Sequence, residues 1–313
     1  MNILVTGGCG FIGRWVVKQL AEDHHKIWIL DNLSNGRIEN IKELQDNYQN
    51  ITFVGGDIKN HILLQNLFTI DFDICYHLAA SINVQDSINN PKMTFDNDIV
   101  GTFNVLNQCK IKRTKFVYMS TCMVYSMALS VNGIKESHPT CPSSPYAGAK
   151  LAGEQIALSY YHAYGLPVTV LRPFNTYGPY QKKNSEGGVI PIFIKRKLEN
   201  KPLLIYGNGT QTRDFLYVTD CSDFVVKTGY SNKTNGKIIN AGSGTDISIK
   251  NLAKRIVDTK DQIKYIPHIH PQSEIQKLLS DNSFAKKVLN WEPHISLKEG
   301  IQLTQNWIKE NMV

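Results

Sequence analysis

A glycine-rich loop near the N-terminus constrains the fold of this chain more than any other feature. Residues 5–13 read VTGGCGFIG and directly follow an apolar run at Asn2–Thr6. An amphipathic segment comes next, with apolar residues at helical spacing: Ile12, Val16 and Leu20. A glycine loop between a strand and a helix is the arrangement that binds a dinucleotide pyrophosphate at the edge of a parallel sheet. Backbone amides at the start of such a helix hold the phosphate anions.

The glycines of this loop have separate expected tasks. Gly7 permits a tight turn, Gly10 lets the backbone approach the pyrophosphate, and Gly13 allows the helix to pack closely against the strand. Phe11 and Ile12 begin the helix and are expected at the same site. The alternative is an ordinary turn in which glycine only supplies a positive φ.

Asp31 ends the second apolar run, IWILD, where an acidic residue meets the adenosine ribose. Its carboxylate can accept hydrogen bonds from both ribose hydroxyls and would repel a 2′-phosphate, which favours NAD over NADP. The alternative is a turn cap formed by Asp31 and Asn32. Asp57 and Ile58 are expected near the adenine, and the small residues of HLAA (77–80) would let the cofactor lie against the backbone. The further residues expected at the NAD site are Asn32, Asp57, Ile58, Leu78, Ala79, Ala80 and Pro173.

The order of apolar patterns predicts an α/β fold. Short apolar runs alternate with helical patterns, which is typical of a parallel sheet with crossover helices. The expected strands are Asn2–Thr6, Lys26–Leu30, Ile51–Val54, Ile74–His77, Lys115–Ser120, Pro167–Leu171 and Lys237–Asn240. The expected helices follow the glycine loop and cover Lys92–Cys109, Tyr146–Tyr164, Ile190–Glu199 and Leu297–Lys309.

After Arg172 the character of the sequence changes. Asn175–Gly188 is rich in Gly, Pro, Asn and Lys and is expected to be an extended loop. We therefore expect a Rossmann-type doubly wound parallel sheet with a smaller mixed C-terminal substrate lobe. The expected division is an NAD-binding domain at 1–174 and a substrate-binding lobe at 175–313, with a sheet contribution from about 212–242.

Composition excludes several classes of protein. The chain has 313 residues, 42% hydrophobic and 19% charged, and its net charge of +7 is dispersed, so no nucleic-acid partner is expected. No apolar run approaches the roughly 20 residues needed to cross a bilayer. No export signal is evident, so a cytoplasmic location without a membrane partner is expected. The six cysteines lack C-x-x-C spacing, so neither a metal site nor a disulfide framework is expected.

A tyrosine and a lysine supply candidate catalytic chemistry. Tyr146 and Lys150 are four residues apart in an expected helix and share one face, and Thr121 follows an expected strand. A free phenol has a pKa near ~10, too high for a good base at neutral pH. A nearby ammonium and an oxidised nicotinamide would stabilise the phenolate and lower this pKa. Thr121 would then orient the reacting hydroxyl. The alternative is an exposed helix face without catalytic function.

Six motifs spread over the chain belong together: VTGGCGFIG (5–13), HLAA (77–80), STCMVY (120–125), SPYAGAK (144–150), RPFNTYGPYQ (172–181) and TRDFLYVTD (212–220). On these motifs the chain resembles the extended short-chain dehydrogenases/reductases, in their nucleotide-sugar epimerase/dehydratase branch. The resemblance runs nearly end to end and is highly specific for the branch, but not for one substrate.

The resemblance implies that Thr121, Tyr146 and Lys150 form a catalytic triad with bound NAD. It implies that Asn175 and Arg213 hold the diphosphate of a nucleotide sugar, which is oxidised at C4. For Arg213 the alternative is a surface ion pair with Asp214. The resemblance also implies a homodimer with a four-helix bundle, built from the helices at Lys92–Cys109 and Tyr146–Tyr164.

The chain departs from the branch at three places. In 4,6-dehydratases the two residues after the threonine are typically Asp and Glu, whereas here they are Cys122 and Met123. Relatives often read R-P-G-D/E where this chain has HPQSE at 270–274, so His270 is expected to grip the nucleotide only weakly. Asp98 stands where the N-V-x-G-T segment of relatives begins with Asn.

Three functional hypotheses follow. The first is a 4-epimerase, which needs hydride removal, rotation of the ketone and hydride return, and needs no residue that titrates at 122 or 123. The second is a 4,6- or 5,6-dehydratase in which Cys122 moves a proton as thiolate. This segment resembles that of a 5,6-dehydratase that also has Ser-Thr-Cys, followed there by Glu where this chain has Met123. As thiol, Cys122 would pack beside the sugar with Met123. The third hypothesis is a non-catalytic NAD-binding sensor.

Overall fold

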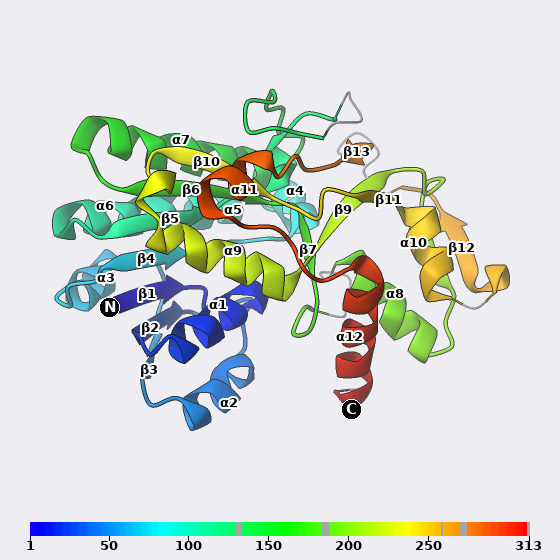
Figure 1. The fold of residues 1–313 in the computed structure, drawn as a ribbon, viewed down its shortest axis with the longest axis horizontal. Helices are drawn as coiled ribbons and strands as arrows, with labels where there is room; N and C mark the ends of the chain where they lie inside the picture. The colour runs from blue at the N-terminus through cyan, green and yellow to red at the C-terminus, as the bar shows by residue number, and fades with distance from the viewer. Residues whose placement is uncertain (129–132, 183–187, 258, 269–273, 312–313) are drawn as a thin grey trace.

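The computed structural model describes residues 1–128, 133–182, 188–257, 259–268 and 274–311. A parallel sheet of seven strands, in the order β10-β6-β5-β4-β1-β2-β3, forms the larger part of the molecule (Figure 1). Its strands are β1 Asn2–Thr6, β2 Lys26–Asp31, β3 Ile51–Gly55, β4 Ile74–His77, β5 Lys115–Met119, β6 Val168–Pro173 and β10 Lys237–Ala241. This is the doubly wound Rossmann topology, and the fold prediction is confirmed.

Helices cover both faces of the sheet, so its strands are apolar on both sides. The side chains of Ile3 and Val5 pack with α1 (Phe11–Glu22), α2 (Glu39–Asn47) and α9 (Val218–Tyr230). Leu4, between them, points to the opposite face. There it packs with α3 (His61–Leu67), α6 (Thr102–Lys112) and α7 (Pro145–Tyr164). The alternation along one strand therefore serves two cores.

The helix expected at Lys92–Cys109 has an internal change of geometry. The chain forms α5 (Pro91–Phe95), then a π-helix η1 (Asp96–Gly101), and then α6, in direct succession. A preceding short helix, α4 (Val84–Asn89), ends where Asn90 precedes Pro91, because proline disfavours a helical residue before it. The chain is thus helical throughout the expected range, and the π turn within it is an addition, because the helical periodicity of the sequence does not distinguish a π turn from an α turn.

The C-terminal part builds a smaller lobe (Figure 1). One sheet pairs β9 (Thr212–Tyr217) with β7 (Asn175–Tyr177), β11 (Asp246–Ser248) and β13 (Lys277–Leu278), and a second pairs β8 (Leu203–Tyr206) with β12 (Ile263–Ile266). The loop expected at Asn175–Gly188 therefore begins as a strand. The remaining helices of the described chain are η2 Cys122–Val124, α8 Val189–Leu198, η3 Asn232–Thr234, α10 Ile249–Ile256, η4 Lys260–Gln262, α11 Ser283–Leu289 and α12 Leu297–Glu310.

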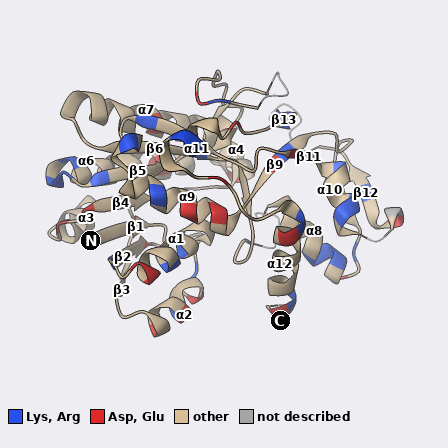
Figure 2. Cartoon of the chain, in the orientation of Figure 1, with Lys and Arg blue, Asp and Glu red and all other residues tan. Residues whose placement is uncertain are grey.

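The two parts are interwoven along the chain. After β9 the chain returns to the large sheet, where α9 packs on α1 and β10 pairs with β6. Lys and Arg are spread over α6, α7, α8, α9 and α10 rather than gathered on one element (Figure 2). Within the described residues, no helix combines the length and the apolar character that a membrane crossing needs.

Candidate active site

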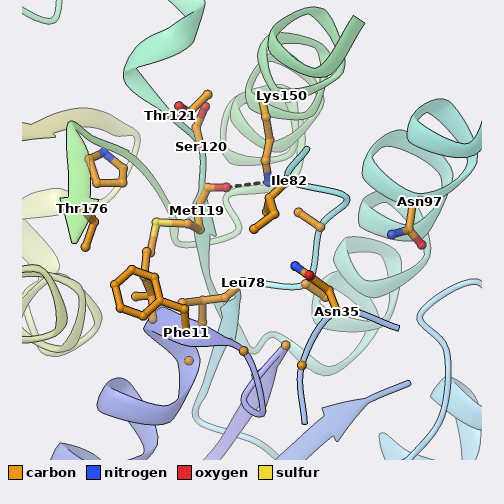
Figure 3. A pocket seen from close by; sticks show the side chains of 18 of the residues that line it. Phe11, Asn35, Leu78, Ile82, Asn97, Met119, Ser120, Thr121, Lys150 and Thr176 are labelled. Atoms are coloured by element: carbon orange, nitrogen blue, oxygen red, sulfur yellow. Dashed lines mark hydrogen bonds between the residues drawn. The ribbon is translucent and has the colours of Figure 1, made fainter. Parts of the chain in front are cut away.

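A cavity of about 360 Å³ opens at the carboxyl ends of the central strands (Figure 3). Loops that follow β1, β2, β4, β5 and β6 all contribute to its wall. This is the edge at which doubly wound sheets bind ligands, and the volume lies within the usual range of ligand pockets. The expected site residues that line it are Gly7, Gly10, Phe11, Ile12, Gly13, Asp31, Asn32, Ile58, Leu78, Ala79, Ala80, Thr121, Cys122, Met123, Tyr146, Lys150, Pro173 and Asn175.

The glycine loop has the geometry of a phosphate cradle. Gly7 has φ +72°, and a Cβ there would lie 2.7 Å from the backbone nitrogen of Ala79. A Cβ on Gly13 would collide with the carbonyl oxygen of Gly7. The helix α1 starts at Phe11 after Gly10, and no side chain caps its first amides. These residues fit a dinucleotide, because the loop approaches closely and its helix amides remain available to an anion.

Asp31 braces the glycine loop and also faces the cavity. Its Oδ2 accepts a hydrogen bond from the Cys9 amide at 3.0 Å, and its Oδ1 accepts one from the Leu33 amide at 2.8 Å. Burial raises the pKa of Asp31, and these two hydrogen bonds oppose that effect. The turn cap and the ribose contact are compatible, because an ionised carboxylate has about four acceptor positions.

Of the two residues expected near the adenine, one lines the cavity and the other does not. Ile58 lines the cavity, whereas Asp57 does not appear in its wall. Asp57 instead accepts hydrogen bonds from the Asn32 side chain at 3.0 Å and from the Lys59 amide at 2.8 Å. Asp57 is therefore placed to hold the loop that carries Ile58 rather than to line the cavity itself.

Tyr146 and Lys150 lie on the first turns of α7, above the end of β5. Ser144 caps this helix by accepting from the Ala147 amide at 3.2 Å, and Pro145 occupies its first position. The Lys150 ammonium points to the end of β5 and donates to the Met119 carbonyl at 2.9 Å, the dashed line in Figure 3. Thr121 hydrogen-bonds Tyr146 through its side chain. The three groups expected to act together are thus assembled.

The protein alone holds Tyr146 in its phenol form. Burial raises the pKa of Tyr146, and the nearby charge of Asp98 raises it further, while the hydrogen bond from Thr121 lowers it. Burial also lowers the pKa of Lys150, and the charges of Asp98 and Glu154 oppose this. Formation of a phenolate therefore depends on additional positive charge at the cavity.

Cys122 and Met123 follow Thr121 in a 3-10 turn, η2. The Thr121 side chain accepts from the Met123 amide at 3.2 Å and fixes this turn. Cys122 packs with Val124, Phe174 and other apolar residues, and burial raises the pKa of its thiol to about 12. A thiol with this pKa stays protonated at neutral pH, so its environment is not that of a reactive thiolate.

Two expected diphosphate ligands differ in position. Asn175 lines the cavity and donates to the Asp214 carbonyl at 3.2 Å. Arg213 is not part of the wall, and its guanidinium forms an ion pair with Glu274 rather than with Asp214. The Asp214 carboxylate is buried and accepts from Ser243, Gly244 and Ser280. His270 lies outside the described residues.

The wall also contains residues that were not expected from the sequence. The clearest are Ser34, Asn35 and Gly36, which come after Leu33 in the loop that follows β2. Their sequence, SNG, is a turn signal at the end of a strand and could have indicated them. Ser120 and Thr176 adjoin the expected residues Thr121 and Asn175, whereas Asn97 and Gln181 are brought in by tertiary packing, for which no local signal exists.

Comparisons with known proteins define the class of protein. A family profile described as GDP-mannose 4,6 dehydratase matches residues 4–304. A putative UDP-glucose 4-epimerase of Methanocaldococcus jannaschii is 35% identical, with 99% of each chain covered. The chain belongs to this family and is an enzyme of the nucleotide-sugar epimerase/dehydratase class, so the hypothesis of a non-catalytic sensor is set aside.

Solved structures agree with this assignment. The X-ray structure of Pal from Bacillus thuringiensis is 58% identical, with a TM-score of 0.98 and all of both chains covered. A dTDP-glucose 4,6-dehydratase from Bacillus anthracis, solved in complex with NAD, is 31% identical, with a TM-score of 0.90 and 99% of this chain and 97% of that chain covered. Epimerases and dehydratases both occur among the relatives, so similarity alone does not select the reaction.

Proposed function

We propose that this enzyme is an NAD-dependent 4-epimerase of a nucleotide-diphosphate hexose. The observation that carries the proposal is the distribution of carboxylates around the cavity. Among the described residues that line it, Asp31 is the one carboxylate. Asp31 ends β2, three strands away from β5 and Thr121, a separation of roughly 14 Å at the usual strand spacing. A dehydratase needs a base for the C5 proton, and no carboxylate of the described wall lies beside Thr121 to act as one.

The proposed chemistry uses the groups at the end of β5. Tyr146 removes the proton from the C4 hydroxyl, Lys150 stabilises the phenolate, and Thr121 hydrogen-bonds the reacting oxygen. NAD, held by the glycine loop and Asp31, supplies the hydride acceptor and the positive charge that lowers the pKa of Tyr146. Reversal after rotation of the ketone gives the C4 epimer. Cys122 and Met123 then act as apolar contacts beside the sugar.

A dehydratase of the 4,6 or 5,6 type is the second candidate, and the Cys122 thiol is the observation that favours it. This thiol lies in the cavity wall next to Thr121. Because its pKa is about 12, it keeps its proton and can serve as an acid for a departing hydroxyl. The same pKa makes it a poor base for C5, which is why we place this reaction second.

Product analysis separates the two reactions. The purified enzyme is incubated in D₂O with UDP-, dTDP- and GDP-hexoses, and the products are followed by NMR and mass spectrometry. We expect inversion at C4 without loss of mass and without deuterium at C5. Loss of one water, together with deuterium at C5, would establish the dehydratase instead.

The division of labour and the assembly belong to the same proposal. We propose that residues 1–174 bind NAD, with the sheet completed from about 212–242, and that residues 175–313 bind the nucleotide sugar. In this scheme Asn175 and Arg213 hold the diphosphate, so Arg213 must exchange its ion pair with Glu274 for the substrate. We propose that two copies pair as a four-helix bundle along the continuous segment α5–η1–α6 and along α7. Apolar side chains exposed on the first of these segments support this: Met93, Phe95, Val100 and Phe103.

A further inference from the structure

Asp98 is a buried carboxyl that the proposed reaction does not use. It lies in the π-helix η1, and 1% of its surface is exposed. Its Oδ1 accepts from the Ser81 amide at 2.7 Å, whereas its Oδ2 is buried without a hydrogen-bond partner in the described structure. An unpaired buried carboxylate oxygen is costly. π turns frequently occur at functional sites, and the unpartnered oxygen leads us to look for a positive charge near Asp98.

The surroundings of Asp98 contain one uncompensated cation. η1 packs against α7, and the charge of Asp98 acts on both Tyr146 and Lys150 of that helix. Figure 3 shows Asn97, the residue before Asp98, at the wall of the same cavity. The titratable groups that face this region are Lys150, Glu154 and Tyr146 from α7, Tyr118 from β5, His77 from β4 and Cys122 from η2.

The other charges in this region are already accounted for. Glu154 receives two hydrogen bonds from the Arg172 guanidinium, one of them at 2.9 Å, so its charge is balanced. His77 is fully buried between the hydroxyls of Thr6 and Thr102, and burial lowers its pKa to about 3, which leaves it neutral. Among the described groups, this leaves the carboxyl of Asp98 and the ammonium of Lys150 as the two charges that act on each other without a balancing ion pair.

We propose that Asp98 is a positioning residue that keeps the buried Lys150 in its ammonium form, as the internal counter-ion of the Tyr146–Lys150 pair. The inference rests on the proposed roles of Tyr146 and Lys150. Lys150 is 2% exposed, and its Nζ donates to one carbonyl, that of Met119. An ammonium in such a place loses its proton readily unless an anion is near.

The same charge has an opposite consequence for the base. The Asp98 charge raises the pKa of Lys150 and also raises that of Tyr146. Removal of the charge should therefore lower both pKa values. The acidic limb of the pH–activity profile then moves to lower pH, because the Tyr146 phenolate forms at lower pH. The alkaline limb also moves to lower pH, because the Lys150 ammonium loses its proton at lower pH. A purely structural residue would change the height of the pH profile and leave its position unchanged.

The decisive experiment titrates Lys150 directly in the folded protein. Protein labelled with [ε-¹³C]lysine is followed by NMR against pH in wild type and in Asp98→Asn, and Lys150→Met identifies the signal. We expect the Lys150 midpoint to fall by about one pH unit or more in Asp98→Asn. The matched control is Asp96→Asn, the same change at a partly exposed residue of the same turn that pairs with Lys92, and there the Lys150 midpoint should not move.

An unchanged or raised Lys150 midpoint in folded Asp98→Asn would overturn the proposal. Should that variant not fold, the reciprocal measurement remains: in Lys150→Met the pKa of Asp98, read from its labelled carboxyl carbon, must rise if the two charges interact. If the pKa of Asp98 does not rise in Lys150→Met, the proposal is overturned as well. Neither titration uses a sugar, so failure of every nucleotide sugar to react would count against the proposed function alone. Where turnover exists, Asp98→Asn should shift the pH optimum downward.

Discussion

The protonation state of Cys122 distinguishes a reactive thiolate from a thiol that only packs beside the sugar. Its pKa of about 12 predicts slow alkylation in the native protein at pH 7.5. Iodoacetamide labelling followed by peptide mass spectrometry measures this, with exposed Cys141 of the same chain as the internal control. Cys141 should label rapidly and Cys122 at least about tenfold more slowly. Equal rates would show a thiolate at Cys122 and would favour the dehydratase.

Replacement of the same thiol gives a second readout at the residue scale. Cys122→Ala removes a buried sulfur from an apolar cluster and should cost about 1 kcal/mol of stability. If Cys122 only packs, turnover should remain within a few-fold of wild type. A loss of 100-fold or more in a folded variant, on the scale of general acid catalysis, would instead assign the thiol to proton transfer.

The helical segment α5–η1–α6 exposes several large apolar side chains, and such a group on a protein surface is typical of an interface with another chain. Phe95 is 53% exposed and Phe103 is 45% exposed, and both lie on the face proposed for the dimer. Phe103→Glu should therefore give a monomer in light scattering, at a protein concentration where the wild type is a dimer. The control is Ile62→Glu on α3, which is 58% exposed and outside this face. A dimer that survives Phe103→Glu would move the interface elsewhere.

At the scale of the whole molecule, one aromatic cluster fastens the small lobe to the first helix of the sheet. Tyr180 does not line the cavity. The centre of its ring lies 3.7 Å from the guanidinium carbon of Arg14 and 4.9 Å from the centre of a ring of Trp307. Arg14 is buried on α1 and hydrogen-bonds the Tyr180 hydroxyl at 2.8 Å. The loop so held lies between Asn175 and Gln181, both of which line the cavity.

This cluster predicts a coupled loss of stability and substrate affinity. Tyr180→Ala should lower the free energy of unfolding by roughly 1–3 kcal/mol, since it removes the ring contact with Trp307 and the cation–π contact with Arg14. It should also raise the KM for the nucleotide sugar more than it lowers kcat. Urea denaturation and steady-state kinetics measure the two effects, with Tyr265→Ala, half-exposed on β12, as the control. Unchanged stability and KM would show that contacts other than those of Tyr180 hold the small lobe against the large sheet.

Local patterns of the sequence predict the large sheet well. The strand β1 and the strand β4 lie at the expected residues, because each is an apolar run bounded by turn or helix signals. The cavity wall could be predicted wherever a strand ends, as at Asp31 and Thr121. The parallel pairing of β7 with β9 could not, because a three-residue strand acquires its partner only in the folded chain. The ion pair of Arg213 with Glu274 likewise depends on segments distant in the sequence.

The central claim is that the phenol of Tyr146 removes the proton as hydride leaves the sugar. The most direct measurement is a single turnover of Tyr146→Phe with a nucleotide sugar that the wild type accepts, followed by reduced-nicotinamide absorbance and by the appearance of product. The control is Tyr164→Phe, the same change at the exposed end of α7. We predict a rate lowered by roughly 10²–10⁴-fold in Tyr146→Phe alone, with NAD binding retained. Turnover of Tyr146→Phe at the wild-type rate would contradict the account.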